Sequence, residues 1–280
     1  MDIEPKQQLD QPAVVLAFSG WNDAGNAASD AVQQLLDHYP ATELDRIDDE
    51  RFYDFQATRP YLKRSADGSW IQWPELKLLR LAHPQRELLV AVGPEPSLQW
   101  RSYARTLIAR IEQYQPSLCV LLGAMLSDSP HSRPLPVTLA TLDHELRHRL
   151  GLEQLNYEGP TGIVGVVNQM LVAEGYPTAS MWVSIPHYVS SPPNPKGQLA
   201  LLQRLEQLLE IELELGELAA EAADWTEAVE ELSQDDPDVA EYVERLEQVS
   251  DAQAVEGATG ETIAADFERY LRGRDDSPQS

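Results

Sequence analysis

The chain has 280 residues, enough to bury a hydrophobic core without disulfide bonds or metal ions, and its 42% hydrophobic and 24% charged residues are typical of a globular protein. The net charge of -25 excludes the basic surface with which proteins bind nucleic acids or anionic membranes. A single cysteine excludes an internal disulfide bond and any metal site built from several cysteines.

Residues 1–10 are polar and lack the apolar stretch of a secretory signal. The longest apolar runs, Val14–Phe18 and Leu118–Leu122, have the length of strands, far short of the roughly 18 residues of a membrane-spanning helix. We therefore expect a cytoplasmic protein. Cys119 lies in the second run without a neighbouring charge that favours the thiolate, so we expect a buried, reduced thiol.

Buried strands alternate with helices along residues 13–195, which predicts an α/β sandwich whose ligands bind beyond the carboxyl ends of the strands. The apolar run Ala13–Ser19 predicts a strand buried on both faces, followed by a loop and a helix that ends near His38. The Asp-Gly pair at residues 67–68 predicts a hairpin between Tyr61–Arg64 and Trp70–Trp73. Further strands are expected within Glu43–Phe55 and at Leu76–Leu81, Glu87–Val92, Ser117–Gly123, Val137–Thr141 and Ala179–Ile185, with helices at Ser97–Tyr114 (capped by Ser97), Asp143–Leu150 and Thr161–Glu174.

The proline-rich segment Ser190–Pro195 predicts a domain boundary, because three prolines in four residues continue neither a strand nor a helix. We expect an α/β core domain at residues 1–195 and an acidic helical C-terminal extension at residues 196–280. Between Glu210 and Glu256 there are 17 acids and a single base, Arg245. This charge is typical of solvated helical faces, and the alternative is a docking surface for a basic partner.

The segment His144–His148 matches the zinc-binding pattern H-E-x-x-H, in which two histidines on one helical face hold the metal. We expect no metal site here, because the surrounding leucines define an apolar stripe that places both histidines on the solvent side. Arg147 also puts a positive charge inside the motif, and no third ligand is evident.

The loop after the first predicted strand contains Asn22, Asp23 and Gly25. Asn22 or Asp23 is a natural N-cap for the following helix, and Gly25 permits a close approach of the backbone. A carboxylate at this position also suits ligand binding or base catalysis, so both interpretations remain open.

Other predicted loops carry polar residues with two interpretations each. His131 and Arg133 follow a buried strand and suit a proton shuttle and an anion clamp, or simply a polar surface loop. His187 lies at the end of a predicted strand, and it is interpreted either as a structural histidine or as a catalytic one. Glu158 and Thr161 precede a helix, where Thr161 is a candidate cap and the nearby glycines favour either close packing or an anion at the helix N-terminus.

Three segments resemble one known family: Phe18–Gly25 (FSGWNDAG), Tyr157–Gly165 (YEGPTGIVG), and Pro186–Val189 (PHYV) followed by PPNPK at residues 192–196. They are similar to the proteasome assembly chaperone 2 family, in its bacterial, actinobacterial-type branch. Residues 238–243 (DVAEYV) and 263–271 (IAADFERYL) extend the resemblance into the C-terminal extension.

The resemblance implies a three-layer α/β/α sandwich of the phosphorylase/hydrolase-like kind with a helical C-terminal extension. It implies a homo-oligomer, with a trimer expected, and a proteasome-related or other protein complex as partner. It implies no catalytic residue, no cofactor and no metal, because the family is not known for enzymes. Family members that dock on proteasomes end in a hydrophobic-tyrosine-any motif, whereas this sequence ends in DDSPQS, so docking by that route is not expected.

Two hypotheses for the function follow. The first is a non-enzymatic, oligomeric protein-interaction module that resembles proteasome assembly chaperones. The alternative is a small-molecule-binding protein or a hydrolase- or phosphorylase-like enzyme that uses the loops at the strand carboxyl ends. The candidate residues for binding a ligand or a partner are Asn22, Asp23, Gly25, His131, Arg133, Glu158, Thr161 and His187.

Overall fold

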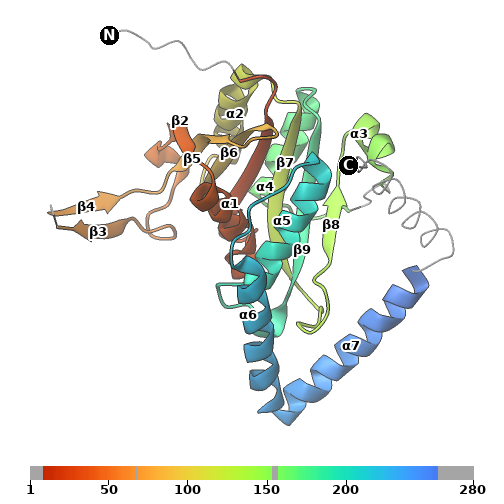
Figure 1. Cartoon of the computed structure of the whole chain (residues 1–280). Coiled ribbons are helices and arrows are strands. Elements are labelled where there is room, and N and C mark those ends of the chain that lie inside the picture. The colour runs from red at the N-terminus through yellow and green to blue at the C-terminus, as the bar shows by residue number, and fades with distance from the viewer. Residues whose placement is uncertain (1–8, 67, 153–156, 258–280) are drawn as a thin grey trace, which may run out of the picture.

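The computed structural model describes residues 9–66, 68–152 and 157–257, and it contains a seven-stranded sheet between two layers of helices (Figure 1). The sheet has the strand order β2-β5-β6-β1-β7-β9-β8. Its strands are β1 (Ala13–Ser19), β2 (Ala41–Ile47), β5 (Leu76–Ala82), β6 (Glu87–Pro94), β7 (Leu118–Ser127), β8 (Val137–Ala140) and β9 (Thr178–Pro186), and a separate hairpin is formed by β3 (Tyr61–Ser65) and β4 (Gly68–Gln72). The helices are α1 (Ala27–His38), α2 (Trp100–Ile111), α3 (His144–Leu150), α4 (Ile163–Ala173), α5 (Pro195–Leu209), α6 (Leu218–Gln234) and α7 (Pro237–Gly257). The predicted three-layer α/β/α architecture is confirmed.

The four central strands are parallel, since β1 pairs with β6 and β7, and β7 pairs with β9. The outer strands make the sheet mixed, because β5 runs antiparallel to β6, β2 to β5, and β8 to β9. The carboxyl ends of β1, β6, β7 and β9 therefore meet at one edge of the sheet, where an α/β fold places its ligands.

Each central strand is buried on both faces because helices cover both sides of the sheet. Val15 of β1 packs in the hydrophobic core shared with α1 and α5, whereas its neighbour Leu16 packs in the core shared with α2 and α4. Both side chains are fully buried. This explains why the sequence of β1 is continuously apolar and does not alternate.

The first helix of the predicted C-terminal extension belongs to the hydrophobic core. It begins at Pro195, and its residues Leu201, Leu202 and Leu205 are fully buried in the core beneath α1. The core therefore extends beyond residue 195. A functional division of the chain at this residue stays a prediction. The tail segment at residues 263–271 lies outside the described residues.

The hairpin β3–β4 projects from the body of the molecule (Figure 1). Every described residue of its two strands is exposed. The exposed fractions of Tyr61, Leu62, Trp70 and Ile71 lie between 44% and 69%. Contiguous exposed apolar side chains are uncommon on a monomeric protein. They are more unusual still on a two-stranded hairpin, which is only marginally stable by itself in water.

The caps predicted for two helices are wrong. Helix α2 begins only at Trp100, because Gln99 before it adopts a left-handed conformation with φ 52°, so Ser97 is not its cap. Helix α4 begins after Gly162 and not at Thr161, and no side chain caps it. In both cases the favoured capping residue lies one or two positions before the actual N-cap, which is Gln99 for α2 and Gly162 for α4. None of the described helices has the length and apolar character needed to span a bilayer.

The substitution Leu205→Ala is expected to lower the free energy of unfolding by about 2–5 kcal/mol, because it leaves a cavity in a closed core. Leu232→Ala on α6 is the matched control, since Leu232 is 66% exposed, and its effect should stay within about 0.5 kcal/mol. Urea denaturation followed by circular dichroism measures both. Equal effects of the two substitutions would contradict the assignment of α5 to the cooperative core.

Candidate functional site

Four loops and the start of one helix meet at the carboxyl edge of the sheet. The loops cover residues 20–26 after β1, 95–99 after β6, 128–136 after β7 and 187–194 after β9. Helix α4 starts at the same edge, because it leads back to the beginning of the parallel strand β9. All the candidate residues predicted from the sequence lie in these loops or directly before α4.

Glu95 joins the loop after β1 to the loop after β6. Its Oε1 accepts a hydrogen bond from the Trp21 backbone N–H at 2.9 Å, and its Oε2 accepts one from the Asn22 side-chain amide at 2.8 Å. Gly20 has φ 128°, and a Cβ there would collide with the Glu95 side chain. Asn22 is nearly fully buried, with its Oδ1 against Gly162 at the start of α4, and this oxygen accepts no hydrogen bond from the described residues.

Asp23 caps helix α1 from a position before its first turn. Its Oδ1 accepts from the Ala28 backbone N–H at 2.7 Å, and its Oδ2 accepts from the Ser29 hydroxyl at 2.5 Å. Burial raises the pKa of Asp23 from 3.8 to about 6, although the hydrogen bonds from Ser29 and the helix amides act in the opposite direction. Such a pKa suits acid–base chemistry, but the observed contacts of both oxygens serve the helix cap.

Gly25 brings the loop after β1 against the segment before α5. It has a left-handed φ of 61°, and its carbonyl accepts from the Asn194 backbone N–H at 3.1 Å. A Cβ at this position would lie only 2.8 Å from the Asn194 Cβ, so glycine is required for the close approach. Asn194 in turn caps α5 by accepting from the Gly197 N–H at 2.8 Å.

His131 is fully buried although it lies in the loop after β7. The Tyr188 hydroxyl accepts from the His131 backbone N–H at 2.8 Å and lies 2.8 Å from its ring Nδ1. Because the Tyr188 oxygen already accepts a hydrogen bond, we assign the tyrosine hydroxyl as the donor and the unprotonated Nδ1 as the acceptor. The ring proton then lies on Nε2, which donates to Glu230 Oε2 at 3.0 Å. Burial lowers the pKa of His131, and the carboxylate of Glu230 partly offsets this effect, which agrees with a neutral ring.

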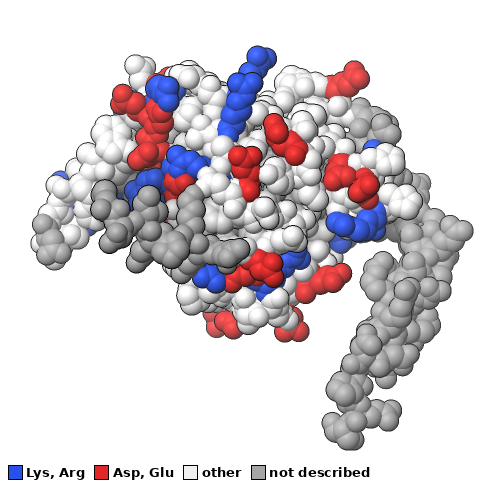
Figure 2. Space-filling view, turned by 90° about the horizontal axis from the view of Figure 1, so that it is seen from above, with Lys and Arg blue, Asp and Glu red and all other residues white. Residues whose placement is uncertain are grey.

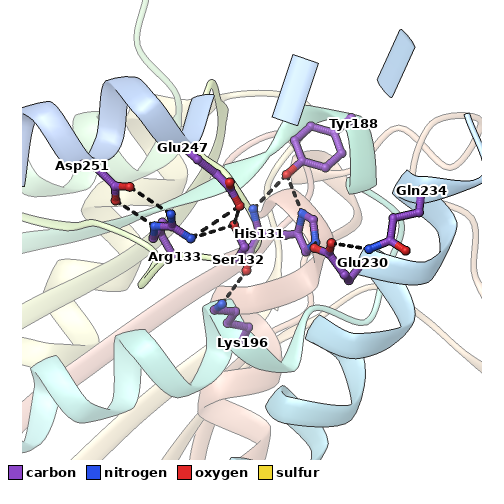
Figure 3. A network of polar contacts seen from close by, with 9 residues as sticks. All are labelled: His131, Ser132, Arg133, Tyr188, Lys196, Glu230, Gln234, Glu247 and Asp251. Carbon is purple, nitrogen blue, oxygen red and sulfur yellow. Dashed lines mark hydrogen bonds and ion pairs between the residues drawn. The ribbon is translucent and has the colours of Figure 1, made fainter. Parts of the chain in front are cut away.

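Arg133 binds two carboxylates of α7 (Figure 3). Its Nε and Nη2 donate to the two oxygens of Asp251 at 2.8 and 2.9 Å, which is a bidentate pair. Its Nη1 lies 3.4 Å from Glu247 Oε1, which also accepts from the Ser132 hydroxyl. Lys196 donates to the backbone carbonyl of His131 next to them. The loop at residues 131–133 therefore holds carboxylates from both α6 and α7.

Aromatic contacts continue this interface beside the loop after β9. The rings of His187, Tyr188 and Tyr242 meet edge to face, with centroids 5.5 to 6.1 Å apart. Asp128 Oδ1 accepts from the Tyr242 hydroxyl at 3.0 Å and lies 3.3 Å from His187 Nδ1. Helix α7 is thus placed against two loops of the sheet edge.

The structure separates the candidate residues into three groups, which are Asn22, Asp23 and Gly25 before α1; His131, Arg133 and His187 near α6 and α7; and the exposed Glu158 and Thr161 before α4. None of them lines the hollow of about 900 Å³ between α1, the hairpin and strands β5 and β6. The first two groups bind other parts of this chain. The alternative function as a small-molecule site or an enzyme stays a prediction.

Sequence reasoning missed the partners of these residues. Glu95 reads as a loop residue between prolines, and Tyr188 appears only within a family-like segment. Glu230, Glu247 and Asp251 are indistinguishable from the other acids of the extension. The one available signal is the four-residue spacing of Glu247 and Asp251, which places both on one face of a helix.

The H-E-x-x-H segment lies on α3, where His144 and His148 are both exposed, as the apolar stripe predicts. Within the described ranges, no group of three or more His, Cys, Asp or Glu side chains is arranged to hold a metal ion. Cys119 is fully buried, and burial raises the pKa of its thiol to about 12, so the thiol form is strongly favoured.

Comparison with known proteins identifies the family. The PAC2 family model matches residues 17–233. This chain belongs to the PAC2 family. The solved structure of a PAC2 family protein from Streptomyces avermitilis is 42% identical, covers 83% of this chain and 99% of its own, and has a TM-score of 0.77. A proteasome-assembly chaperone homologue from Mycobacterium tuberculosis is 40% identical, covers 82% of this chain and 99% of its own, and has a TM-score of 0.75.

A more distant structure shares the fold of this PAC2 protein. PbaB from Pyrococcus furiosus, an archaeal proteasome activator, is 13% identical, covers 80% of this chain and 94% of its own, and has a TM-score of 0.64. A search of curated proteins gave no match. The family and the α/β fold inferred from the sequence are confirmed.

The substitution Asp23→Asn is expected to stabilise the protein at neutral pH. The pKa of the Asp23 carboxyl is about 6 in the folded state, against 3.8 when the group is exposed. Between pH 3.8 and pH 6 the folded state therefore keeps a proton that the unfolded state has lost. Above pH 6 the folded state must bury the charged carboxylate, which lowers its stability. This shift corresponds to roughly 3 kcal/mol, so we expect the variant to gain about 1–3 kcal/mol at pH 7.5 and nothing at pH 4. Urea denaturation at both pH values checks this.

Asp224→Asn at an exposed position of α6 is the control for Asp23→Asn and should show no such pH-dependent gain. If Asp23→Asn is less stable than the wild type at pH 7.5, the negative charge itself is needed by the helix cap.

Proposed function

We propose that this PAC2 protein is a non-enzymatic, self-associating interaction module that assists the assembly of a proteasome-related complex in the cytoplasm, with a trimer as its working form. The observation that carries the proposal is the exposed apolar hairpin β3–β4. Support comes from the relatives, since the Mycobacterium tuberculosis protein is described as a proteasome-assembly chaperone homologue and the Pyrococcus furiosus protein as a proteasome activator.

The hairpin combines apolar and basic side chains. Lys63 lies opposite Trp70, and Leu62 lies opposite Ile71. The ammonium group of Lys63 also lies 5.8 Å from the centre of the Tyr61 ring. Large aromatic and aliphatic side chains held out by so little structure are typical of a surface that another chain covers.

The charge of the hairpin is opposite to that of the whole chain. Residues 61–72 contain two bases, Lys63 and Arg64, and one acid, Asp67, which gives a net charge of +1, whereas the chain carries a net charge of -25. Over the end of the body seen from above, acidic and basic side chains are interspersed (Figure 2). Most of the excess of acid lies in residues 210–256. Copies of an acidic protein repel one another over a screening length of about 8 Å, so a basic arm is favoured as the first contact.

The double substitution Trp70→Thr and Ile71→Thr is expected to convert an oligomer into a monomer, because it removes apolar contact area while keeping β-forming residues. Light scattering coupled to size-exclusion chromatography measures the mass. The wild type should have three times the chain mass of 31.3 kDa, and the variant should have the chain mass itself.

Leu142→Ser is the matched control, since Leu142 is 46% exposed but lies far from the hairpin in sequence, before α3. It should leave the oligomer intact. A wild type that is monomeric at micromolar concentration would contradict self-association, and an oligomer that survives the hairpin substitutions would place its interface elsewhere.

The proteasome-related role is tested by reconstitution. Purified subunits of the proteasome core particle from the same organism are mixed with and without this protein, and formation of the particle is followed by native electrophoresis. We expect at least a twofold faster appearance of the particle with the wild type and no acceleration with the hairpin variant. Equal rates in all three mixtures, with no complex to any subunit, would contradict this role.

A further inference from the structure

We propose that the carboxyl edge of the sheet contains a docking site for an acidic, amphipathic helix of a partner protein. The site consists of His131, Ser132, Arg133, Tyr188 and Lys196, which we call the edge surface. Residues 218–257, comprising α6 and α7, are called the acidic strap, and they occupy the edge surface in this structure (Figure 3). This inference does not depend on the proposed self-association or on a proteasome-related role.

The edge surface presents fixed donors for carboxylates. Arg133 holds Asp251 through a bidentate pair, the Ser132 hydroxyl donates to Glu247, and His131 donates from Nε2. The donors are supported from behind, because Tyr188 orients the His131 ring. A preorganised set of this kind favours a segment that offers carboxylates at the same spacing, because few side chains have to be ordered on binding.

Beside these donors lies unoccupied apolar space with further positive charge. A hollow of about 330 Å³ is lined by apolar side chains that include Leu135, Val137 and Leu199, with Lys196 and Arg204 also on its wall. Neither of these two bases has a carboxylate partner in the described part of the chain. Apolar space flanked by bases whose described partners are neutral oxygens complements a helix that carries both apolar and acidic side chains.

Helix α7 is the part of the acidic strap that is held in a way that permits its displacement, whereas α6 is anchored because its Leu218 belongs to the core shared with α1 and α5. No described residue of α7 belongs to either hydrophobic core, and its buried apolar side chains are Val243 and Leu246. Its carboxylate contacts to Arg133 are partly exposed, and ion pairs of that kind contribute little to stability. Helix α7 is therefore the internal competitor, and a partner helix that takes its place shifts the equilibrium toward the open edge surface around Ser132 and Arg133.

The test uses the full chain with the substitutions Glu230→Gln, Glu247→Gln and Asp251→Asn, called the open-strap variant. The probe is a fluorescent peptide of residues 237–252, which contains the α7 carboxylates Glu247 and Asp251, and fluorescence anisotropy measures its Kd. We expect a Kd at least tenfold lower than for the wild type, because the tethered strap competes at an effective concentration in the millimolar range. The gain should shrink at 0.5 M salt.

The matched control carries Asp224→Asn, Glu231→Gln and Glu244→Gln, which change the charge by the same amount at exposed positions of the same helices. Its Kd should stay within about twofold of the wild type. Adding Arg133→Gln to the open-strap variant should abolish the gain. If the open-strap variant fails to fold by circular dichroism, Asp251→Asn alone is expected to lower the Kd about threefold.

Three results would overturn the proposal. The first is an open-strap variant that binds the peptide no more tightly than the matched control. The second is an open-strap variant whose Kd is unchanged when Arg133→Gln is added. The third is a change of oligomer mass in the open-strap variant without peptide binding, which would show that α7 is exchanged between copies of this chain.

Discussion

Burial of the central strands on both faces is the constraint on which the rest of this structure depends. Val15 and Leu16 are neighbours in β1 but face two different hydrophobic cores, so no position before the last residue of the strand is left for a polar side chain in contact with water. Polar chemistry is therefore restricted to the strand ends. Because four strands are parallel, their carboxyl ends gather at one edge, and the loops there become the polar part of the molecule.

At this edge the chain satisfies many polar groups with its own atoms. Asp23 binds helix amides, Glu95 joins two loops, and His131 lies between a tyrosine and a glutamate. These contacts fix loops and helices relative to one another. They explain why residues that suit catalysis by type are engaged in positioning the backbone.

Most of the fold could be predicted from the sequence, since continuous apolar runs such as Ala13–Ser19 mark doubly buried strands and Asp-Gly marks the hairpin. The antiparallel direction of β5 and β8 could not be predicted, because an apolar run has the same pattern in either direction. The cap at Ser97 was wrong because the left-handed turn at Gln99 depends on packing and is not encoded in a capping residue.

The candidate site was only half predictable for a similar reason. His131 and Arg133 stand out because such residues are scarce in their loop, whereas their partners are three acids among many. Glu230 and Glu231 are adjacent residues of the same type, so the sequence does not indicate which of them contacts His131. Only the packing of α6 on α5 and the turn before Pro237 decide which acids face the loop.

The division of labour within the acidic strap has an evolutionary consequence. Glu230, Glu247 and Asp251 meet specific donors, whereas most other acids of α6 and α7 point to solvent. Solvent-facing positions are interchangeable with one another as long as the total charge keeps the protein in solution, so they can drift among related sequences. The three contacting positions bind residues that lie 99, 115 and 118 positions away in the sequence. A change at any of them is therefore expected only together with a change of its distant partner.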